Sequence, residues 1–427
     1  MPQIPARTLT AISCLLLLLI CESFAQDLPT AKPEDLGFST ERLARLDETF
    51  NSYVNENKMA GSVILIARKG KVGYFKAFGF RDKELNSKME LGSIFRIASQ
   101  TKAIVSTGIM MLQEEGKLLI EDPVGRFIPE FKETTVAVPK AGGGYEVVKA
   151  KRPMTIRDLL THTAGVGYGE NGVAAEEWKK ADMQGFYFAH RDEPVAETIK
   201  RMAALPMNAH PGEQWVYGYA TDILGVVIER ASGMPLDQFL KTHIFDPLGM
   251  ADTYFFLPKD KAKRLATVYM PTDGQPLKPA PSKGTIESQG QYVDGPRKNF
   301  SGGAGLLSTA KDYFLFLQMM ANGGELHGNR IISPNTVRLM TINHLSEPVT
   351  FGKGLGFGLG FEVMLDQGKR GIPGSVGEYR WGGAYGSTFW VDPAEEMIVV
   401  YFTQLRPGSI VQDQAMLRVL VYQALVD

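Results

Sequence analysis

The feature that most constrains this chain is a Ser-x-x-Lys pair at the start of an apolar helical pattern. Ser99 and Lys102 stand three residues apart, and apolar residues at helical spacing follow at Ile104, Ile109 and Leu112. Residues i and i+3 of a helix share a face, so the hydroxyl and the amine are expected to be neighbours. The positive field at a helix N-terminus favours negative charge on the serine. The spacing therefore indicates an activated nucleophile.

A second Ser-x-x-Lys pair, Ser308 and Lys311, prevents the spacing alone from deciding the matter. Thr309 and Asp312 there have the spacing of a capping box before a helix over residues 313–320, so helix capping explains this pair without catalysis. Taken alone, Ser99 is equally compatible with a helix cap. The rest of the sequence has to decide.

Composition is that of an ordinary globular protein, and it gives no argument for a nucleic-acid partner. The chain has a net charge of -1, and 44% of its residues are hydrophobic. Its length of 427 residues is enough for two domains or one large one. The glycines at 142–144 lack the Gly-Lys-Ser/Thr of a phosphate loop, and no dinucleotide fingerprint is present. The six histidines show no metal-ligand spacing. No cofactor and no metal are therefore expected.

Residues 1–25 have the pattern of a secretory signal peptide. Arg7 precedes a short apolar run that includes five leucines, and Ser23-Phe24-Ala25 is a small-x-small cleavage site. Cleavage would leave Gln26 as the first residue and would remove both cysteines, Cys14 and Cys21. We expect a periplasmic or secreted protein with no stable membrane anchor after cleavage; an uncleaved anchor is the alternative.

The remaining chain divides into an α/β part and a mainly helical part. A helix is predicted over 40–54, a strand pair over 62–68 and 72–80, and a final helix over 410–426. Late strands are predicted over 356–365, 377–381, 386–391 and 397–404. Early and late strands are expected to share one antiparallel sheet. We predict a discontinuous sheet domain, 26–120 and 300–427, and a mainly helical domain with long loops, 121–299, with the active site in the cleft between them.

Several stretches of the chain resemble the serine β-lactamase and penicillin-binding-protein superfamily, and in particular the class C-like branch with the family VIII carboxylesterases. The matching stretches are residues 97–102, Leu159 to Gly165, Pro211-Gly212 with Tyr217 and Leu224-Gly225, Pro247 to Met250, and Gly302 to Leu306. The resemblance covers most of the mature chain. It implies the β-lactamase/transpeptidase-like fold, α/β plus all-α, in which helices flank an antiparallel sheet and a helical domain is inserted.

The resemblance also assigns roles to individual residues. Ser99 would be the nucleophile, Lys102 its base or a fixed positive charge, and Tyr217 a second proton carrier. Trp381-Gly382-Gly383 looks like the Trp-x-Gly variant of the substrate-binding strand. The backbone N–H groups of Ser99 and Ala384 would then form the oxyanion hole. The alternative for the Trp381 segment is a packing tryptophan with turn glycines.

Two departures from the β-lactamase pattern favour an esterase. Tyr219 occupies the substrate-binding position of an asparagine that holds the amide side chain of a β-lactam. Lys369-Arg370-Gly371 has only the bare spacing of Lys-Thr-Gly and lies among loop residues. A triad that uses His162 stays open, because triads assemble from distant residues, but the motif around His162 favours a structural role in its loop.

The sequence thus predicts an exported serine hydrolase that acts on short-chain esters through an acyl-enzyme, with weak activity on β-lactams such as cephalosporins. Its partners are small-molecule substrates, and the sequence makes no prediction of oligomeric state. The alternatives are a class C-type β-lactamase, a D-alanyl-D-alanine carboxypeptidase or D-aminopeptidase, and a non-catalytic sensor that binds β-lactams or muropeptides.

Overall fold

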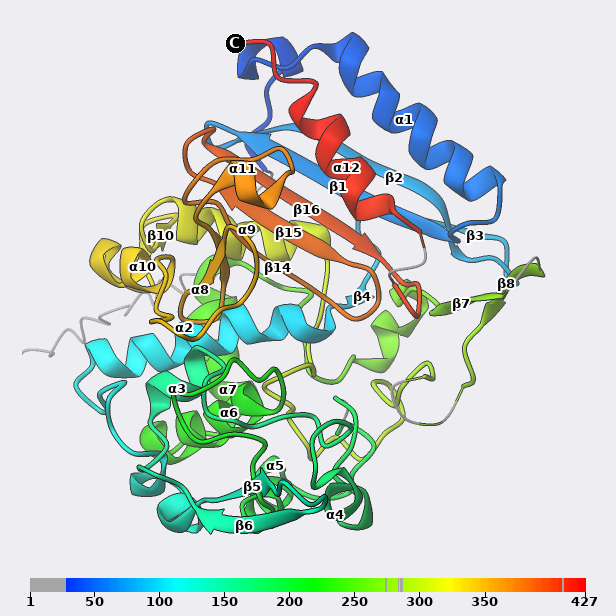
Figure 1. Ribbon diagram of the computed structural model, residues 1–427. Coiled ribbons are helices and arrows are strands. Elements are labelled where there is room, and N and C mark those ends of the chain that lie inside the picture. The colour runs from blue at the N-terminus through cyan, green and yellow to red at the C-terminus, as the bar shows by residue number, and fades with distance from the viewer. Residues whose placement is uncertain (1–27, 187, 273–274, 283, 285–286, 409–410) are drawn as a thin grey trace, which may run out of the picture.

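One antiparallel sheet unites the early and late strands of the chain. The structure is a computed structural model that describes residues 28–427 except 187, 273–274, 283, 285–286 and 409–410, so the predicted leader lies outside the described residues. The strands of the main sheet are β1 Gly61–Arg68, β2 Lys71–Asp82, β3 Ser87–Lys88, β12 Leu355–Phe357, β13 Glu362–Met364, β14 Tyr379–Gly382, β15 Thr388–Asp392 and β16 Met397–Thr403. They lie in the order β12-β13-β14-β15-β16-β1-β2-β3 (Figure 1).

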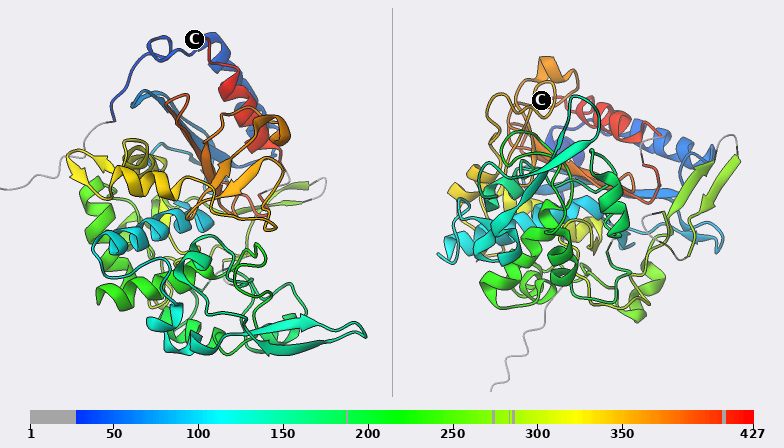
Figure 2. Two further views of the ribbon diagram at one scale, coloured as in Figure 1. Left: turned by 60° about the vertical axis from the view of Figure 1, so that its left-hand side comes forward. Right: turned by 60° about the horizontal axis from the view of Figure 1, so that its bottom comes forward.

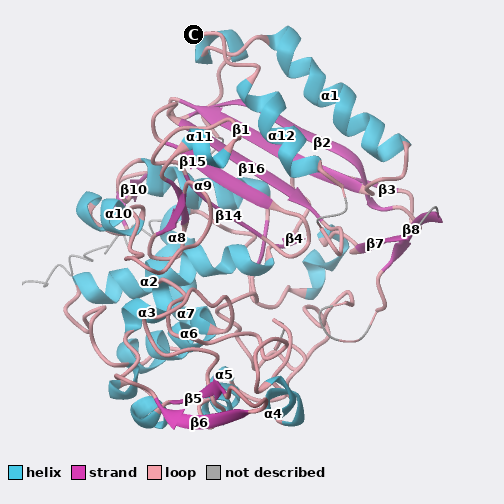
Figure 3. Ribbon diagram, viewed as in Figure 1, coloured by secondary structure: helices cyan, strands magenta, loops and turns pink. Residues whose placement is uncertain are grey.

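The pairing of β1 with β16 joins the two ends of the chain, with Ser62 opposite Thr403 and Arg68 opposite Met397. Every residue of β1 is buried because helices cover both faces of the sheet (Figure 3). Side chains alternate along a strand. Ile64 and Ile66 pack with the helices α1 Thr40–Asn55 and α12 Asp413–Tyr422. Val63 and Leu65 face the opposite core, which includes α9 Ala310–Ala321.

The helix that follows Ser99, α2 Thr101–Glu114, crosses the middle of the molecule between the sheet and the remaining helices (Figure 1). It is buried on all sides from Thr101 to Leu112, as expected of a helix with core on every face. The other helices are α3 Ile156–Leu160, α4 Ala175–Lys180, α5 Val195–Met202, α6 Ala220–Ser232, α7 Leu236–Leu240, a π-helical turn Lys241–Phe245, α8 Asp246–Leu248, α10 Pro334–Met340 and α11 Gln367–Arg370.

Short two-stranded ribbons complete the fold, and two of them lie in the segment predicted as mainly helical. These two are β5 Thr135–Pro139 with β6 Tyr145–Lys149, and β7 Tyr269–Thr272 with β8 Gln275–Pro279. The β5–β6 ribbon projects beyond the neighbouring helices (Figure 2), and the predicted glycine loop forms its turn. The other ribbons are β4 Phe95–Arg96 with β9 Leu307–Ser308 and β10 Glu325–Leu326 with β11 Asn329–Arg330.

The predicted continuous strand over 356–365 is wrong, because the chain reverses inside it. β12 and β13 are antiparallel neighbours, and the Gly358 N–H donates to the Phe361 carbonyl at 2.7 Å across the turn. Gly360 adopts a φ of +93°, which glycine reaches without steric cost.

The domain boundaries at 121 and 299 stay a prediction. Among the described residues, no helix is both long and apolar enough to cross a membrane.

Candidate active site

Ser99 lies in a tight turn that long-range contacts hold in place. The 3₁₀ turn Ala98–Gln100 leads directly into α2, and Ala98 has a φ of +44°, a strained value for a residue with a side chain. Tyr313 of α9 donates its hydroxyl to the Gln100 carbonyl at 2.9 Å. Thr101 Oγ1 accepts from the Leu306 N–H at 3.1 Å. The strained turn at the candidate nucleophile is therefore fixed by the segment before β9 and by α9.

Lys102 is buried, with 1% of its surface exposed, and its ammonium group points at polar and aromatic partners. Nζ donates to the Gly303 carbonyl at 2.8 Å and to the Tyr168 hydroxyl at 3.0 Å. The same Nζ lies 4.7 Å from the centre of the Tyr217 ring. A buried cation needs such partners because desolvation is costly. The structure thus brings the Lys102 ammonium group and the Tyr217 ring together. Lys102 itself lies one helical turn after Ser99.

Aromatic side chains from the His162 loop, from β14 and from its own segment surround Tyr217, which precedes α6. Its ring lies edge to face with those of His162 and Trp381, at centroid distances of 4.8 and 5.4 Å, and stacks on Trp215 at 5.7 Å. Trp381 Nε1–H donates to the Tyr217 hydroxyl at 3.2 Å. The phenol oxygen is therefore oriented by β14, the strand predicted to bind substrate.

Tyr168 is a site residue that the sequence reasoning missed. It follows the Leu159 to Gly165 stretch, accepts the hydrogen bond from Lys102 and packs against Tyr217 with ring centres 5.5 Å apart. Burial raises the pKa of Tyr168 well above its usual range, and Tyr217 and Asp222 add to the rise. It therefore stays a neutral phenol beside Lys102. Proximity to a matching motif was the only signal in the sequence.

The end of β14 presses against the Ser99 turn and explains why residue 383 is glycine. A Cβ at Gly383 would lie 2.5 Å from the Ile97 carbonyl oxygen and 3.8 Å from Ala98 Cβ. Gly383 N–H donates to Ser387 O at 2.8 Å, which closes the turn after Trp381 and Gly382. Ala384 packs in the cluster that contains Ala98. Among the described residues, the Ala384 N–H donates to no other group, which leaves this amide available for an oxyanion.

Tyr219, predicted to bind substrate, lies in the core instead. Its ring is fully buried, stacks on Phe188 with centroids 4.9 Å apart, and also faces Trp178 and Tyr168. Two residues further along the chain than Tyr217, its ring is thus enclosed by aromatic side chains. The structure therefore gives Tyr219 a packing position behind the site.

His162 is buried beside Tyr217 and has a φ of +58°. Burial lowers its pKa well below the usual range, and the positive charge of Lys102 lowers it further. His162 is therefore a neutral residue that packs against the phenol and shapes its loop. Among the described residues, no group of three or more His, Cys, Asp or Glu side chains could hold a metal ion.

The second Ser-x-x-Lys pair has a structural environment. Ser308 is fully buried in β9, and its hydroxyl lies 2.8 Å from Thr253 Oγ1. Thr309 caps α9 by accepting from the Asp312 N–H at 3.1 Å. Only this half of the predicted capping box forms, because the Asp312 carboxylate instead accepts from the Asp252 N–H and from Thr253.

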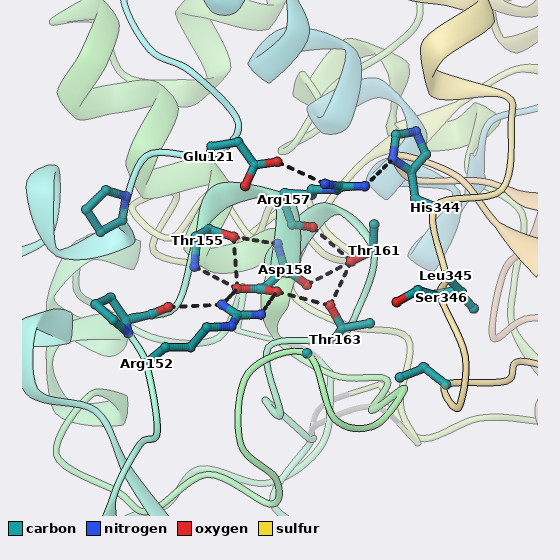
Figure 4. A pocket seen from close by; sticks show the side chains of 14 residues that line it. Glu121, Arg152, Thr155, Arg157, Asp158, Thr161, Thr163, His344, Leu345 and Ser346 are labelled. Atoms are coloured by element: carbon teal, nitrogen blue, oxygen red, sulfur yellow. Dashed lines mark hydrogen bonds and ion pairs between the residues drawn. The ribbon is translucent and has the colours of Figure 1, made fainter.

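A separate polar cavity of about 580 Å³ lies behind the His162 loop (Figure 4). The Asp158 carboxylate lies on its wall and accepts from Nη1 and Nη2 of Arg152, at 2.6 and 2.8 Å. It also caps α3 through Thr155 in a complete capping box. Thr163 donates to the same carboxylate at 3.3 Å. The lining does not include Ser99, Lys102 or Tyr217. This cavity is therefore not part of the candidate active site.

Comparison with known proteins places this geometry in a family. Residues 46–423 match the family model described as Beta-lactamase. Esterase EstB from Burkholderia gladioli is 33% identical over 375 residues, covering 84% of this chain and 90% of EstB. The solved structure of EstCE1, a hydrolase with promiscuous acyltransferase activity, superposes with a TM-score of 0.76 at 28% identity and covers 90% of this chain and 99% of EstCE1. A penicillin-binding protein homologue from Pyrococcus abyssi shares the fold, with a TM-score of 0.65 at 24% identity and coverage of 89% and 77%.

Replacement of the candidate nucleophile tests the choice between the two serines. Ser99→Ala is expected to abolish covalent labelling by a fluorophosphonate probe, whereas Ser308→Ala is expected to keep it. Labelling is measured by intact mass and the modified peptide is mapped. The assignment fails if the Ser308 variant loses labelling and the Ser99 variant retains it.

The close approach of β14 to the nucleophile turn yields a second prediction. A methyl group in Gly383→Ala would clash with the Ile97 carbonyl and push the Ala384 amide away from Ser99. Loss of one oxyanion donor slows acylation about 10²-fold, so we expect a loss of that order in the labelling rate. Gly142→Ala, in the turn of the β5–β6 ribbon, is the control, since a Cβ there meets no atom within 4 Å, and it should label at the wild-type rate. Equal rates for the two variants would contradict the placement of Ala384.

Proposed function

The chain belongs to the beta-lactamase family and is a serine hydrolase, and we propose that it is a carboxylesterase that cleaves short-chain esters through an acyl-enzyme. The observation that carries the proposal is the convergence of Lys102 and Trp381 on Tyr217. Lys102 lies one helical turn after Ser99. The similarity to Esterase EstB over most of both chains supports the same chemistry.

The proposed reaction has two steps. In the first, Tyr217, as a phenolate beside the fixed positive charge of Lys102, accepts the Ser99 hydroxyl proton while Oγ attacks the ester carbonyl, and the Ser99 and Ala384 amides hold the oxyanion. Collapse breaks the bond to the leaving oxygen, which takes the proton from Tyr217 and departs as an alcohol. In the second step, water loses a proton to Tyr217 and attacks the acyl-enzyme. Collapse breaks the bond to Ser99 Oγ and releases the carboxylic acid, and the proton on Tyr217 returns to Oγ.

Two features favour esters over β-lactams. The position two residues after Tyr217 holds the buried Tyr219, which cannot offer an amide to the side chain of a β-lactam. The Trp381 indole lies near the end of β14. A cationic side chain at this position would bind the carboxylate of a β-lactam better than the uncharged indole does. A neutral ester needs neither group. β-Lactams still have an activated carbonyl, so we propose slow turnover of cephalosporins as a side activity.

A side-by-side assay distinguishes the candidate functions. We expect the purified protein to release p-nitrophenol from p-nitrophenyl butyrate at least 100-fold faster, by kcat/KM, than it opens nitrocefin. Such a ratio corresponds to about 3 kcal/mol in transition-state free energy. Faster nitrocefin hydrolysis would instead indicate a class C-type β-lactamase, and release of D-alanine from a D-alanyl-D-alanine peptide with inert esters a carboxypeptidase. Stoichiometric acylation without turnover would indicate a sensor.

We further propose that the protein is exported and that its signal peptide is removed after Ala25. The support is the short apolar segment after Arg7 and the small residues Ser23 and Ala25. Cell fractionation should recover the protein in the periplasm or medium, and N-terminal sequencing should begin at Gln26. Ala25→Phe should block processing, because the cleavage site requires a small residue. A cytoplasmic protein that retains residue 1 would rule out this proposal.

A further inference from the structure

A buried carboxylate lies behind Lys102 and takes no part in the reaction described above. Asp222 is in the first turn of α6 and has 1% of its surface exposed. Its Oδ1 accepts from the Ser301 hydroxyl at 2.6 Å and from the Gly303 N–H at 3.1 Å. Asp222 thus anchors the 301–303 segment, which comes from a distant part of the chain.

The anchored segment ends in the group that holds Lys102. The Gly303 carbonyl accepts from Lys102 Nζ at 2.8 Å, while the N–H of the same residue bonds Asp222. One glycine therefore connects the carboxylate to the ammonium group. A movement of Asp222 would move the acceptor on which the ammonium group depends.

Glycine is required at this point because the segment lies so close to α6. A Cβ at Gly303 would be 2.3 Å from Asp222 Oδ2, and one at Gly302 would be 2.6 Å from the Thr221 carbonyl oxygen. These distances are shorter than any ordinary contact. The Gly302-Gly303 pair, which the sequence connected only to a family resemblance, thus has a physical reason in this packing.

Charge links the same two residues. Burial raises the pKa of Asp222, and the positive charge of Lys102 acts in the opposite direction. Two opposite charges buried near each other interact far more strongly than on the surface. The negative charge of Asp222 also contributes to the raised pKa of Tyr168 and of Tyr219. The ionisable groups around the Asp222–Lys102 pair are Tyr168, Tyr217, Tyr219 and His162.

We propose that Asp222 is the positioning residue for Lys102: it fixes the Gly303 carbonyl that holds Nζ, and its negative charge balances the buried ammonium group. The proposal rests on the proposed function in that Lys102 assists Ser99. Asp222 touches neither Ser99 nor the substrate in this scheme and acts through Gly303 and through its charge.

The test is the pH dependence of Ser99 labelling by a fluorophosphonate probe in Asp222→Asn. Asparagine keeps an oxygen acceptor for Ser301 and Gly303 but removes the charge. Loss of a buried negative charge makes proton release easier for every ionisable neighbour, so both limbs of the pH–rate profile should move to lower pH, by about one unit. The maximal rate should fall about 10-fold. Asp222→Ala, which also releases Gly303, should lose more.

Asp312→Asn is the matched control. Asp312 is also a buried carboxylate in the first turn of a helix, α9, and its carboxylate also accepts from a backbone N–H and a hydroxyl. A merely structural role predicts similar losses of stability for both variants and no movement of either pH limb. An unshifted profile in Asp222→Asn, or the same shift in Asp312→Asn, would overturn the proposal.

Two further measurements keep the outcome interpretable. If Asp222→Asn does not fold, Gly303→Ala replaces it, because the added methyl forces the segment off Asp222 while the charge stays; labelling should slow at least 10-fold, and a wild-type rate would overturn the proposal. Labelling requires no ester turnover. A wild-type protein that labels at Ser99 but leaves p-nitrophenyl butyrate intact therefore contradicts the proposed function and not the role of Asp222.

Discussion

The burial of the Lys102 ammonium group is the constraint on which the active-site architecture depends. An isolated charge in a protein interior is too costly to keep, so each direction around Nζ has to offer a partner. The Gly303 carbonyl, the Tyr168 hydroxyl and the Tyr217 ring supply them. These groups come from three segments far apart in the sequence. Their convergence on one nitrogen determines where the loops after α3, before α6 and before β9 must run.

The sheet supplies the opposite side of the site. β1 pairs with β16 in the interior of the sheet, and β15 then places β14 beside the Ser99 turn. Because both faces of the sheet are covered by helices, β14 has little freedom to move relative to α2. Gly383, which lies between Gly382 and Ala384, is therefore held against the Ser99 turn by the core itself, and such a fixed arrangement would suit a reaction that depends on fixed donors.

Local patterns in the sequence could predict much of this arrangement. The spacing of Ser99 and Lys102, the apolar run 63–67 of the strand at 62–68 and the capping box at Thr155 depend on neighbours within a few residues, and the structure contains each of them. Tyr168 and Asp222 could not be found this way, because their roles exist only after distant loops meet. Tyr219 was assigned to the substrate by position in a motif, whereas its aromatic neighbours, Trp178 and Phe188, draw it into the core.

The most direct test of the account is to trap the acyl-enzyme itself. Rapid acid quenching of the protein with p-nitrophenyl butyrate, followed by intact mass and peptide mapping, should show one butyryl group per chain on Ser99 that disappears as substrate is exhausted. A butyryl group on Ser308, or steady hydrolysis with no covalent intermediate on Ser99, would contradict the account.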